Sequence, residues 1–171
     1  MEEVGIRHGV ARIDLLVVNA LLHGYEVKSD RDSLRRLPGQ IAVYSSVLDR
    51  VTLVVGYRHA GEAIRLVPPW WGVKLAEMGP RGAVRVIEAR PSRLNPSVDR
   101  VSLAKLLWRD EALEFLKELG QAEGVLSKTR SVIYARLAEV ASLDQLRELV
   151  CEALKRRPLQ RPGELPGSSG G

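Results

Sequence analysis

Residues 10–28 read VARIDLLVVNALLHGYEVK, and this stretch decides which fold the sequence favours. It holds two runs rich in branched and aromatic residues around a short connection, a pattern typical of paired strands. Side chains alternate between the faces of a strand, so Glu26 and Lys28 share one face. Asp14 joins them if paired positions have an even sum of residue numbers, and an odd sum places it on the other face. A sum of 40 sets Asp14 opposite Glu26.

The remaining sequence divides into a part that favours strands and a part that favours helices. Strands are expected at Val10–Val18, Gly24–Lys28, Val51–Tyr57, Gly72–Ala76 and Ala83–Glu88. Helices are expected at Pro38–Leu48, Val101–Leu119, Val132–Val140 and Ser142–Lys155. The connection that follows Lys28 carries Asp30 and Asp32, which are expected to cap a short turn. The pattern predicts an α/β core over residues 1–96, a helical extension packed on it over 97–156 and a disordered tail over 157–171.

Composition limits the classes of protein that fit. A chain of 171 residues with 45% hydrophobic and 27% charged residues is typical of a folded globular protein. Its single cysteine, Cys151, excludes an internal disulfide and a zinc site with several cysteines. No run approaches the ~20 apolar residues that span a bilayer, and no secretory signal is visible, so a cytoplasmic protein without a membrane partner is expected.

The charge of the chain favours an anionic partner without requiring one. Its net charge is +5, and 20 of its 26 basic residues are arginine, whose planar guanidinium binds phosphate well. Genomic base composition explains the same enrichment equally well. Arg31, Arg35 and Arg36 follow the Glu26-Val27-Lys28 strand and are expected to contact phosphates, the alternative being a solvated charged turn.

The shared face of Asp14, Glu26 and Lys28 allows two interpretations. Two close carboxylates form an oxygen site suited to Mg²⁺, and a nearby lysine stabilises charge on a phosphodiester. A cross-strand ion pair on a sheet face uses the same residues, and spacing alone favours that simpler interpretation. Gln40 and Tyr44, one turn apart on the next expected helix, add to the pattern.

With Gln40 and Tyr44 included, the sequence resembles the PD-(D/E)XK nuclease superfamily. It is more similar to an uncharacterised bacterial family of PD-(D/E)XK-like proteins, the "sce" family, and more distantly to MmcB-type repair proteins. The segments that carry the resemblance are His8–Asp14, Gly24–Leu34, Arg36–Gln40 with Tyr44, Pro69–Gly72 and Leu106–Glu111. The resemblance implies a restriction-endonuclease-like mixed sheet. It also implies that the first core helix is missing ahead of Glu3, which matches an upstream acidic residue of the family.

The resemblance further implies a nuclease that hydrolyses phosphodiester bonds in DNA. Mg²⁺ (or Mn²⁺) would be held by Asp14, Glu26 and the carbonyl of Val27. Lys28 would stabilise charge on the phosphate.

In the same family pattern, Gln40 and Tyr44 would position the site or the nucleic-acid strand. The alternatives are an inactive module that keeps the nuclease fold and binds nucleic acid or another partner, and an assembly protein. In the assembly protein the helical extension would bind a protein partner or a second copy. Trp70 and Trp71 are expected to fill the edge of the core, although aromatic rings also stack on unpaired bases.

Overall fold

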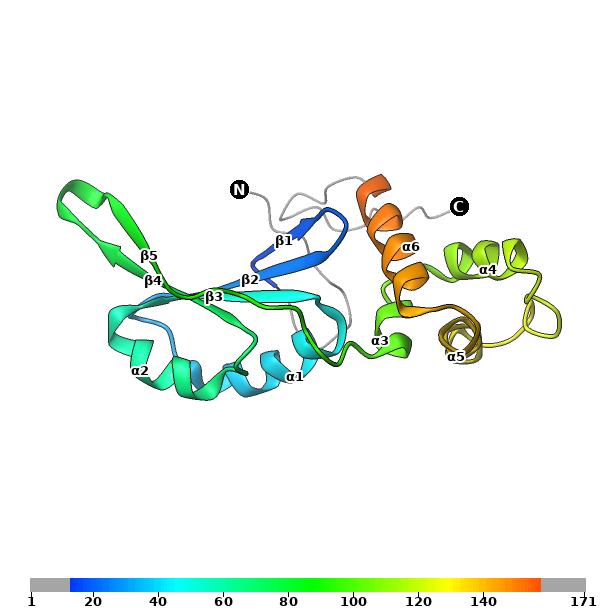
Figure 1. The fold of residues 1–171 in the computed structure, drawn as a ribbon, viewed down its shortest axis with the longest axis horizontal. Coiled ribbons are helices and arrows are strands. Elements are labelled where there is room, and N and C mark those ends of the chain that lie inside the picture. Colours follow the sequence, from blue (N-terminus) through cyan, green and yellow to red (C-terminus); the bar gives the residue numbers. More distant parts are fainter. Residues whose placement is uncertain (1–12, 158–171) are drawn as a thin grey trace, which may run out of the picture.

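The computed structural model describes residues 13–157 and contains one five-stranded mixed sheet (Figure 1). The strands are β1 (Leu15–Val18), β2 (Leu22–Lys28), β3 (Arg50–Gly56), β4 (Gly72–Met78) and β5 (Val84–Arg90). They lie in the order of the sequence: β1 and β2 are antiparallel, β2, β3 and β4 are parallel, and β4 and β5 are antiparallel. The predicted α/β fold with a helical C-terminal region is confirmed.

Two helices connect the parallel strands and lie against one face of the sheet, in cyan and blue-green in Figure 1. The helix α1 (Leu37–Val47) has Pro38 in its first turn and agrees with its predicted bounds to within one residue. The helix α2 (Tyr57–Leu66) follows β3 directly and was not among the helices expected from the sequence, and Tyr57, expected to end a strand, begins α2 instead. Parallel neighbours need a crossover connection, and α2 supplies it between β3 and β4.

Residues 97–157 contain four helices, α3 (Arg100–Ala104), α4 (Arg109–Glu118), α5 (Arg130–Val140) and α6 (Leu143–Arg156). The prediction of one helix over Val101–Leu119 was wrong because the backbone is extended at Trp108, with ψ of 155°. Glu111 caps the start of α4 by accepting a hydrogen bond from the Trp108 amide at 2.6 Å. Ser142 caps α6 as predicted.

A continuous hydrophobic core runs from the sheet into the helical region, here residues 97–157, without a break at the start of that region. Its largest fully buried side chains include Trp71, Tyr44, Leu53, Leu116, Leu137 and Leu146. The Trp71 ring stacks on Tyr44 with 6.2 Å between centroids, which confirms its expected place in the core. The division at residue 97 stays a prediction, and the expected tail falls almost wholly on residues 158–171, outside the described part.

The two faces of the sheet differ in exposure. Along β2 the side chains of Leu22, Glu26 and Lys28 are buried on the face that α1 covers, whereas Val27 on the other face is half exposed. Among residues 13–157, no helix has the length and apolar character that crossing a membrane requires.

Candidate functional site

The β1–β2 register decides where Asp14 lies. Leu15 pairs with Tyr25 and Val18 with Leu22, so paired residue numbers sum to 40. The sequence left open an even or an odd sum, and the structure has the even one. This register sets Asp14, the residue just before β1, opposite Glu26. Asp14 Oδ2 accepts a hydrogen bond from the amide of Val27 at 2.7 Å, which fixes the carboxylate beside β2.

The Glu26 carboxylate is the centre of a polar cluster inside the fold, which we call the Glu26 cluster (Glu26, Lys28, Gln40 and Tyr44). Glu26 is 1% exposed. Its Oε1 accepts hydrogen bonds from Lys28 Nζ and from Gln40 Nε2, the latter at 2.6 Å. Its Oε2 accepts a hydrogen bond from the Tyr44 hydroxyl at 2.8 Å. A buried carboxylate is costly without hydrogen bonds, and three donors, one of them the Lys28 ammonium, supply them here.

Tyr44 is held in its neutral form by these surroundings. Burial raises the pKa of its phenol far above the ordinary value, and the charge and hydrogen bond of Glu26 raise this pKa further. Its hydroxyl therefore keeps its proton at ordinary pH and donates it to Glu26 in a hydrogen bond.

Gly24 allows the core to close over β2 next to the cluster. A Cβ atom at this position would lie 2.1 Å from the Ile13 Cδ1 atom and 2.6 Å from that of Leu48. These two buried side chains fill the space beside Gly24.

The loop after β2 presents Arg31, Arg35 and Arg36, all of them exposed. Asp30 and Asp32 do not cap a turn as predicted: Asp30 Oδ1 accepts a hydrogen bond from the Arg58 amide at the start of α2, at 3.0 Å. Both carboxylates still fix the loop.

Asp32 Oδ2 binds the hydroxyl and the amide of Ser29, each at 2.7 Å, and these bonds lower the pKa of its carboxyl group. The cap of the short turn Leu34–Arg36 is Ser33. The loop backbone is therefore fixed, while the guanidinium groups point to solvent.

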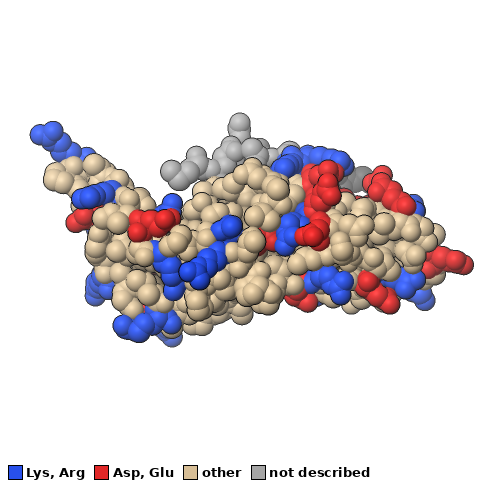
Figure 2. Space-filling model, in the orientation of Figure 1, with Lys and Arg blue, Asp and Glu red and all other residues tan. Residues whose placement is uncertain are grey.

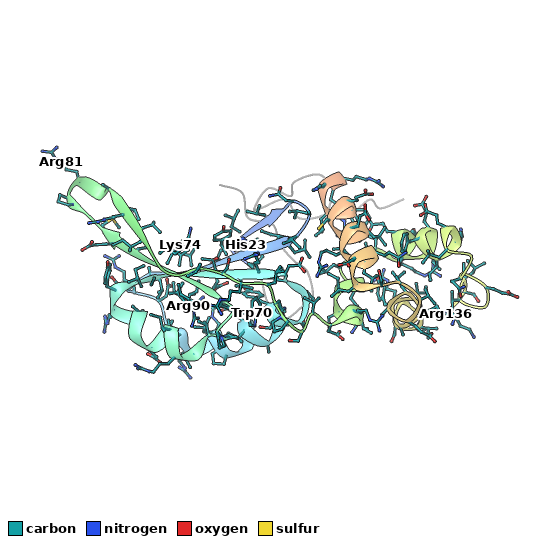
Figure 3. The ribbon with its side chains drawn as sticks, viewed as in Figure 1. His23, Trp70, Lys74, Arg81, Arg90 and Arg136 are labelled. Carbon is teal, nitrogen blue, oxygen red and sulfur yellow. The ribbon has the colours of Figure 1, made fainter. Side chains whose placement is uncertain are left out.

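The open sheet face carries a group of residues that the sequence analysis did not single out as a site. The rings of His23 and Tyr25 stack with 4.4 Å between centroids, and His23 Nε2 lies 2.9 Å from Thr52 Oγ1. Burial lowers the pKa of His23, and the charges of Arg50 and Lys74 lower it further. Figure 3 shows His23 and Lys74 on the same side of the sheet. Alternation along β2 is the signal that groups His23 with Tyr25.

The sequence matches the family model described as "Bacteriophage P4 protein cII" over residues 1–161. The chain belongs to this family. It is similar to "Protein cII" of Enterobacteria phage P4, with 26% identity over 157 residues that cover 92% of the chain. The chain spans 58% of the length of that phage protein. No solved structure matches the chain.

Membership of the P4 cII family overturns the resemblance to the PD-(D/E)XK superfamily and to the bacterial "sce" family. The nuclease function, and the inactive module with a nuclease fold, were inferred from that resemblance, so both interpretations were wrong. Four of the residues that suggested the nuclease resemblance do lie together, because Glu26, Lys28, Gln40 and Tyr44 form one hydrogen-bonded cluster. A Glu-x-Lys strand facing a Gln-x-x-x-Tyr helix thus also occurs in a P4 cII-family fold.

The roles assigned to single residues stay predictions. Glu3 lies outside the described residues. Within the described helical region the exposed large apolar side chains are Trp108, Leu126 and Val132, and a protein partner or second copy at this surface also stays a prediction. Trp108 is partly covered by the Arg157 guanidinium, 4.6 Å from the ring centroid.

The oxygens available in the Glu26 cluster do not fit a bound Mg²⁺ in this arrangement. Both oxygens of Glu26 accept hydrogen bonds, and Lys28 already balances its charge. Gln40 Oε1, a buried oxygen without a hydrogen bond, and Asp14 offer the remaining places. Among residues 13–157, no group of three or more His, Cys, Asp or Glu could hold a metal ion. Mg²⁺ prefers an octahedral set of oxygens and keeps several waters, so it would have to displace Lys28.

We therefore expect millimolar Mg²⁺ or Mn²⁺ to raise the melting temperature no more than NaCl of equal ionic strength. Thermal unfolding followed by circular dichroism measures this effect. A selective rise that the substitution Asp14→Asn abolishes would instead support the predicted metal site at Asp14, Glu26 and the Val27 carbonyl.

Proposed function

We propose that this chain binds nucleic acid, with duplex DNA as the ligand, through exposed arginines of the sheet region (residues 13–96). This region contains 12 Lys and Arg against 8 Asp and Glu, whereas residues 97–157 contain 11 against 10. The excess positive charge therefore lies on the sheet region. Figure 2 agrees with this count, since basic patches predominate over the sheet region, while basic and acidic patches alternate over the helices.

The observation that carries the proposal is the difference in ion pairing between the two regions. Five arginines of the helical region form ion pairs with carboxylates: Arg109, Arg136, Arg147, Arg156 and Arg157. The eight exposed arginines of the sheet region have no carboxylate of residues 13–157 within 4.0 Å: Arg31, Arg35, Arg36, Arg58, Arg65, Arg81, Arg85 and Arg93.

Unpaired guanidinium groups at this density favour a polyanionic partner. Each one carries a full charge at every physiological pH and can bind a phosphate through two parallel hydrogen bonds. Binding to DNA releases condensed counterions, which provides a driving force without any loss of internal ion pairs. Arg31, Arg35 and Arg36 are suited to such contacts because their side chains are exposed on an ordered backbone: Arg31 lies in the loop held by Asp30 and Asp32, and the other two lie in the turn that Ser33 caps.

We expect the triple substitution of Arg31, Arg35 and Arg36 by alanine to weaken binding to duplex DNA and to reduce its salt dependence. Each lost phosphate contact lowers the slope of log K against log[salt] by about 0.9, so the full effect is a reduction of about 2–3. Fluorescence anisotropy of a labelled duplex over a series of NaCl concentrations gives this slope.

The matched control removes the same charge from the helical region by replacing Lys117, Arg130 and Arg156 with alanine. All three are exposed, and Arg156 is ion-paired with Glu152 at 3.0 Å. We expect this control to keep the slope of the unsubstituted protein. If the slope falls equally in both variants, net charge and not the position of the arginines causes the effect. If the unsubstituted protein does not bind DNA at low salt, the proposal is refuted.

A further inference from the structure

The β4–β5 hairpin extends beyond the rest of the sheet. β3 pairs with β4 as far as Ala76, which lies opposite Gly56, and from there onward β4 pairs with β5 alone. We call residues 77–85 the arm, and Figure 1 shows it projecting away from the body of the protein. A two-stranded ribbon without further support is marginally stable in water, so the arm is suited to fold against a ligand.

One face of the hairpin is apolar and exposed. Met78 pairs with Val84, and Ala76 pairs with Val86, so these side chains lie side by side on one face. Met78 is 75% exposed, Val84 61% and Val86 51%. Large apolar side chains that gather at such exposure are typical of an interaction surface.

The tip of the arm presents a cation in an uncommon backbone conformation. Arg81 has a φ of 65°, in the left-handed region, which residues other than glycine rarely adopt. Figure 3 shows its side chain pointing away from the protein at the far end of the hairpin. The arm contains Arg81 and Arg85 against the single acid Glu77, so it carries net positive charge.

We propose that the arm enters the major groove of duplex DNA. The apolar face of the hairpin, Met78, Val84 and Val86, lies against thymine methyl groups, and Arg81 contacts a phosphate at the edge of the groove. This inference rests on the proposed function and specifies which element and which groove are used.

The dimensions of the arm favour the major groove. Two paired strands lie about 4.8 Å apart, and a sheet with its side chains is about 10 Å thick. The major groove is about 12 Å wide and accepts a two-stranded ribbon, whereas the minor groove is about 6 Å wide. Thymine methyl groups are exposed in the major groove, and they are the apolar feature that an apolar ribbon face can contact there.

The charge of the arm disfavours a second copy of this chain as the occupant. Two arms of equal net positive charge repel each other, whereas a phosphate backbone attracts both.

The test uses two duplexes of equal sequence and charge, one with thymine and one with deoxyuridine, which lacks the methyl group. Three proteins are compared: the full chain, the full chain with Met78→Ser and Val84→Ser, and a shortened chain. In the shortened chain Asn-Gly replaces residues 77–85, because this pair forms a two-residue hairpin turn. Circular dichroism and melting temperature confirm that each variant is folded.

We expect the unsubstituted chain to bind the thymine duplex about fourfold more tightly for each methyl group buried. The serine variant loses this preference and keeps its salt slope. The shortened chain loses the preference, and the loss of Arg81 and Arg85 lowers its salt slope by up to about 2.

Three results would overturn the inference. If the unsubstituted chain binds neither duplex, the proposed function fails together with it. If the unsubstituted chain binds both duplexes equally and the shortened chain does the same, DNA binding stands and the arm has no part in it. If the unsubstituted chain is a dimer by light scattering and the shortened chain a monomer, the arm is an interface between copies.

Discussion

Replacing Glu26 with alanine is expected to lower the free energy of unfolding by about 3–5 kcal/mol, the usual cost of breaking a buried ion pair. The substitution leaves the Lys28 ammonium, whose side chain is 8% exposed, without a counter-charge. It also removes the acceptor of the Gln40 amide and of the Tyr44 hydroxyl, both inside the fold. Urea unfolding followed by circular dichroism measures the change.

The double variant Glu26→Leu with Lys28→Met is the control for this prediction. It removes both charges and fills the space with apolar atoms, so we expect a much smaller loss than for Glu26→Ala, because replacing a buried pair is often close to neutral. A loss in the double variant as large as in the single one would show that the charge of Lys28 is not the cause. A single variant that is more stable than the unsubstituted protein would indicate that the cluster is kept for binding at a cost in stability.

Replacing Asp49 with alanine is expected to cost about 3 kcal/mol, because it also breaks a buried ion pair. Asp49 is 2% exposed, and its Oδ2 accepts a hydrogen bond from the Leu22 amide at 2.8 Å. Its Oδ1 accepts one from Arg147 Nε at 2.7 Å, which joins the start of β3 to α6. The loss therefore weakens the contact between the sheet region and the helical region.

Asp144 provides a matched control, since it accepts a hydrogen bond from the same guanidinium at 2.5 Å but its side chain is 92% exposed. We expect Asp144→Ala to cost less than about 1 kcal/mol, as exposed ion pairs do. Equal costs for the two variants would contradict the assigned role of burial. Two separate unfolding transitions in Asp49→Ala would support the predicted division of the chain at residue 97.

Local patterns in the sequence were sufficient to predict most of the sheet. The β-branched runs located all five strands, and alternation along β2 correctly placed Glu26 and Lys28 on one face. Pro38 and Ser142 marked the starts of α1 and α6 because proline and serine have specific roles in the first turn of a helix.

The elements that were missed depend on contacts between distant residues. The segment of α2 contains Gly61 and follows β3 without a capping side chain of its own, so nothing local marks its start. Its cap is Asp30, a residue of the loop after β2. Likewise, the ion pair of Asp49 with Arg147 joins positions 98 residues apart, which no local pattern predicts.

The sequence correctly predicted which side chains gather around Glu26, but the family inferred from them was wrong. The spacing correctly indicated that Lys28, Gln40 and Tyr44 meet around the Glu26 carboxylate, whereas the Asp14 carboxylate accepts a hydrogen bond from the Val27 amide instead. A buried carboxylate needs such donors whether or not it binds a ligand, so the same residues fit a structural cluster and a catalytic one. The family was decided by similarity over nearly the whole chain, and these five positions are a small part of it.

The order of the strands has a consequence for the protein during its synthesis. Because the sheet follows the order of the sequence, each strand that leaves the ribosome can pair at once with the strand made just before it. Asp49 enters the nascent sheet early, yet its partner Arg147 is translated 98 residues later, which takes about 5–20 s at ordinary elongation rates. During that interval the carboxylate lacks its guanidinium, so the nascent sheet region stays less stable until α6 emerges and docks.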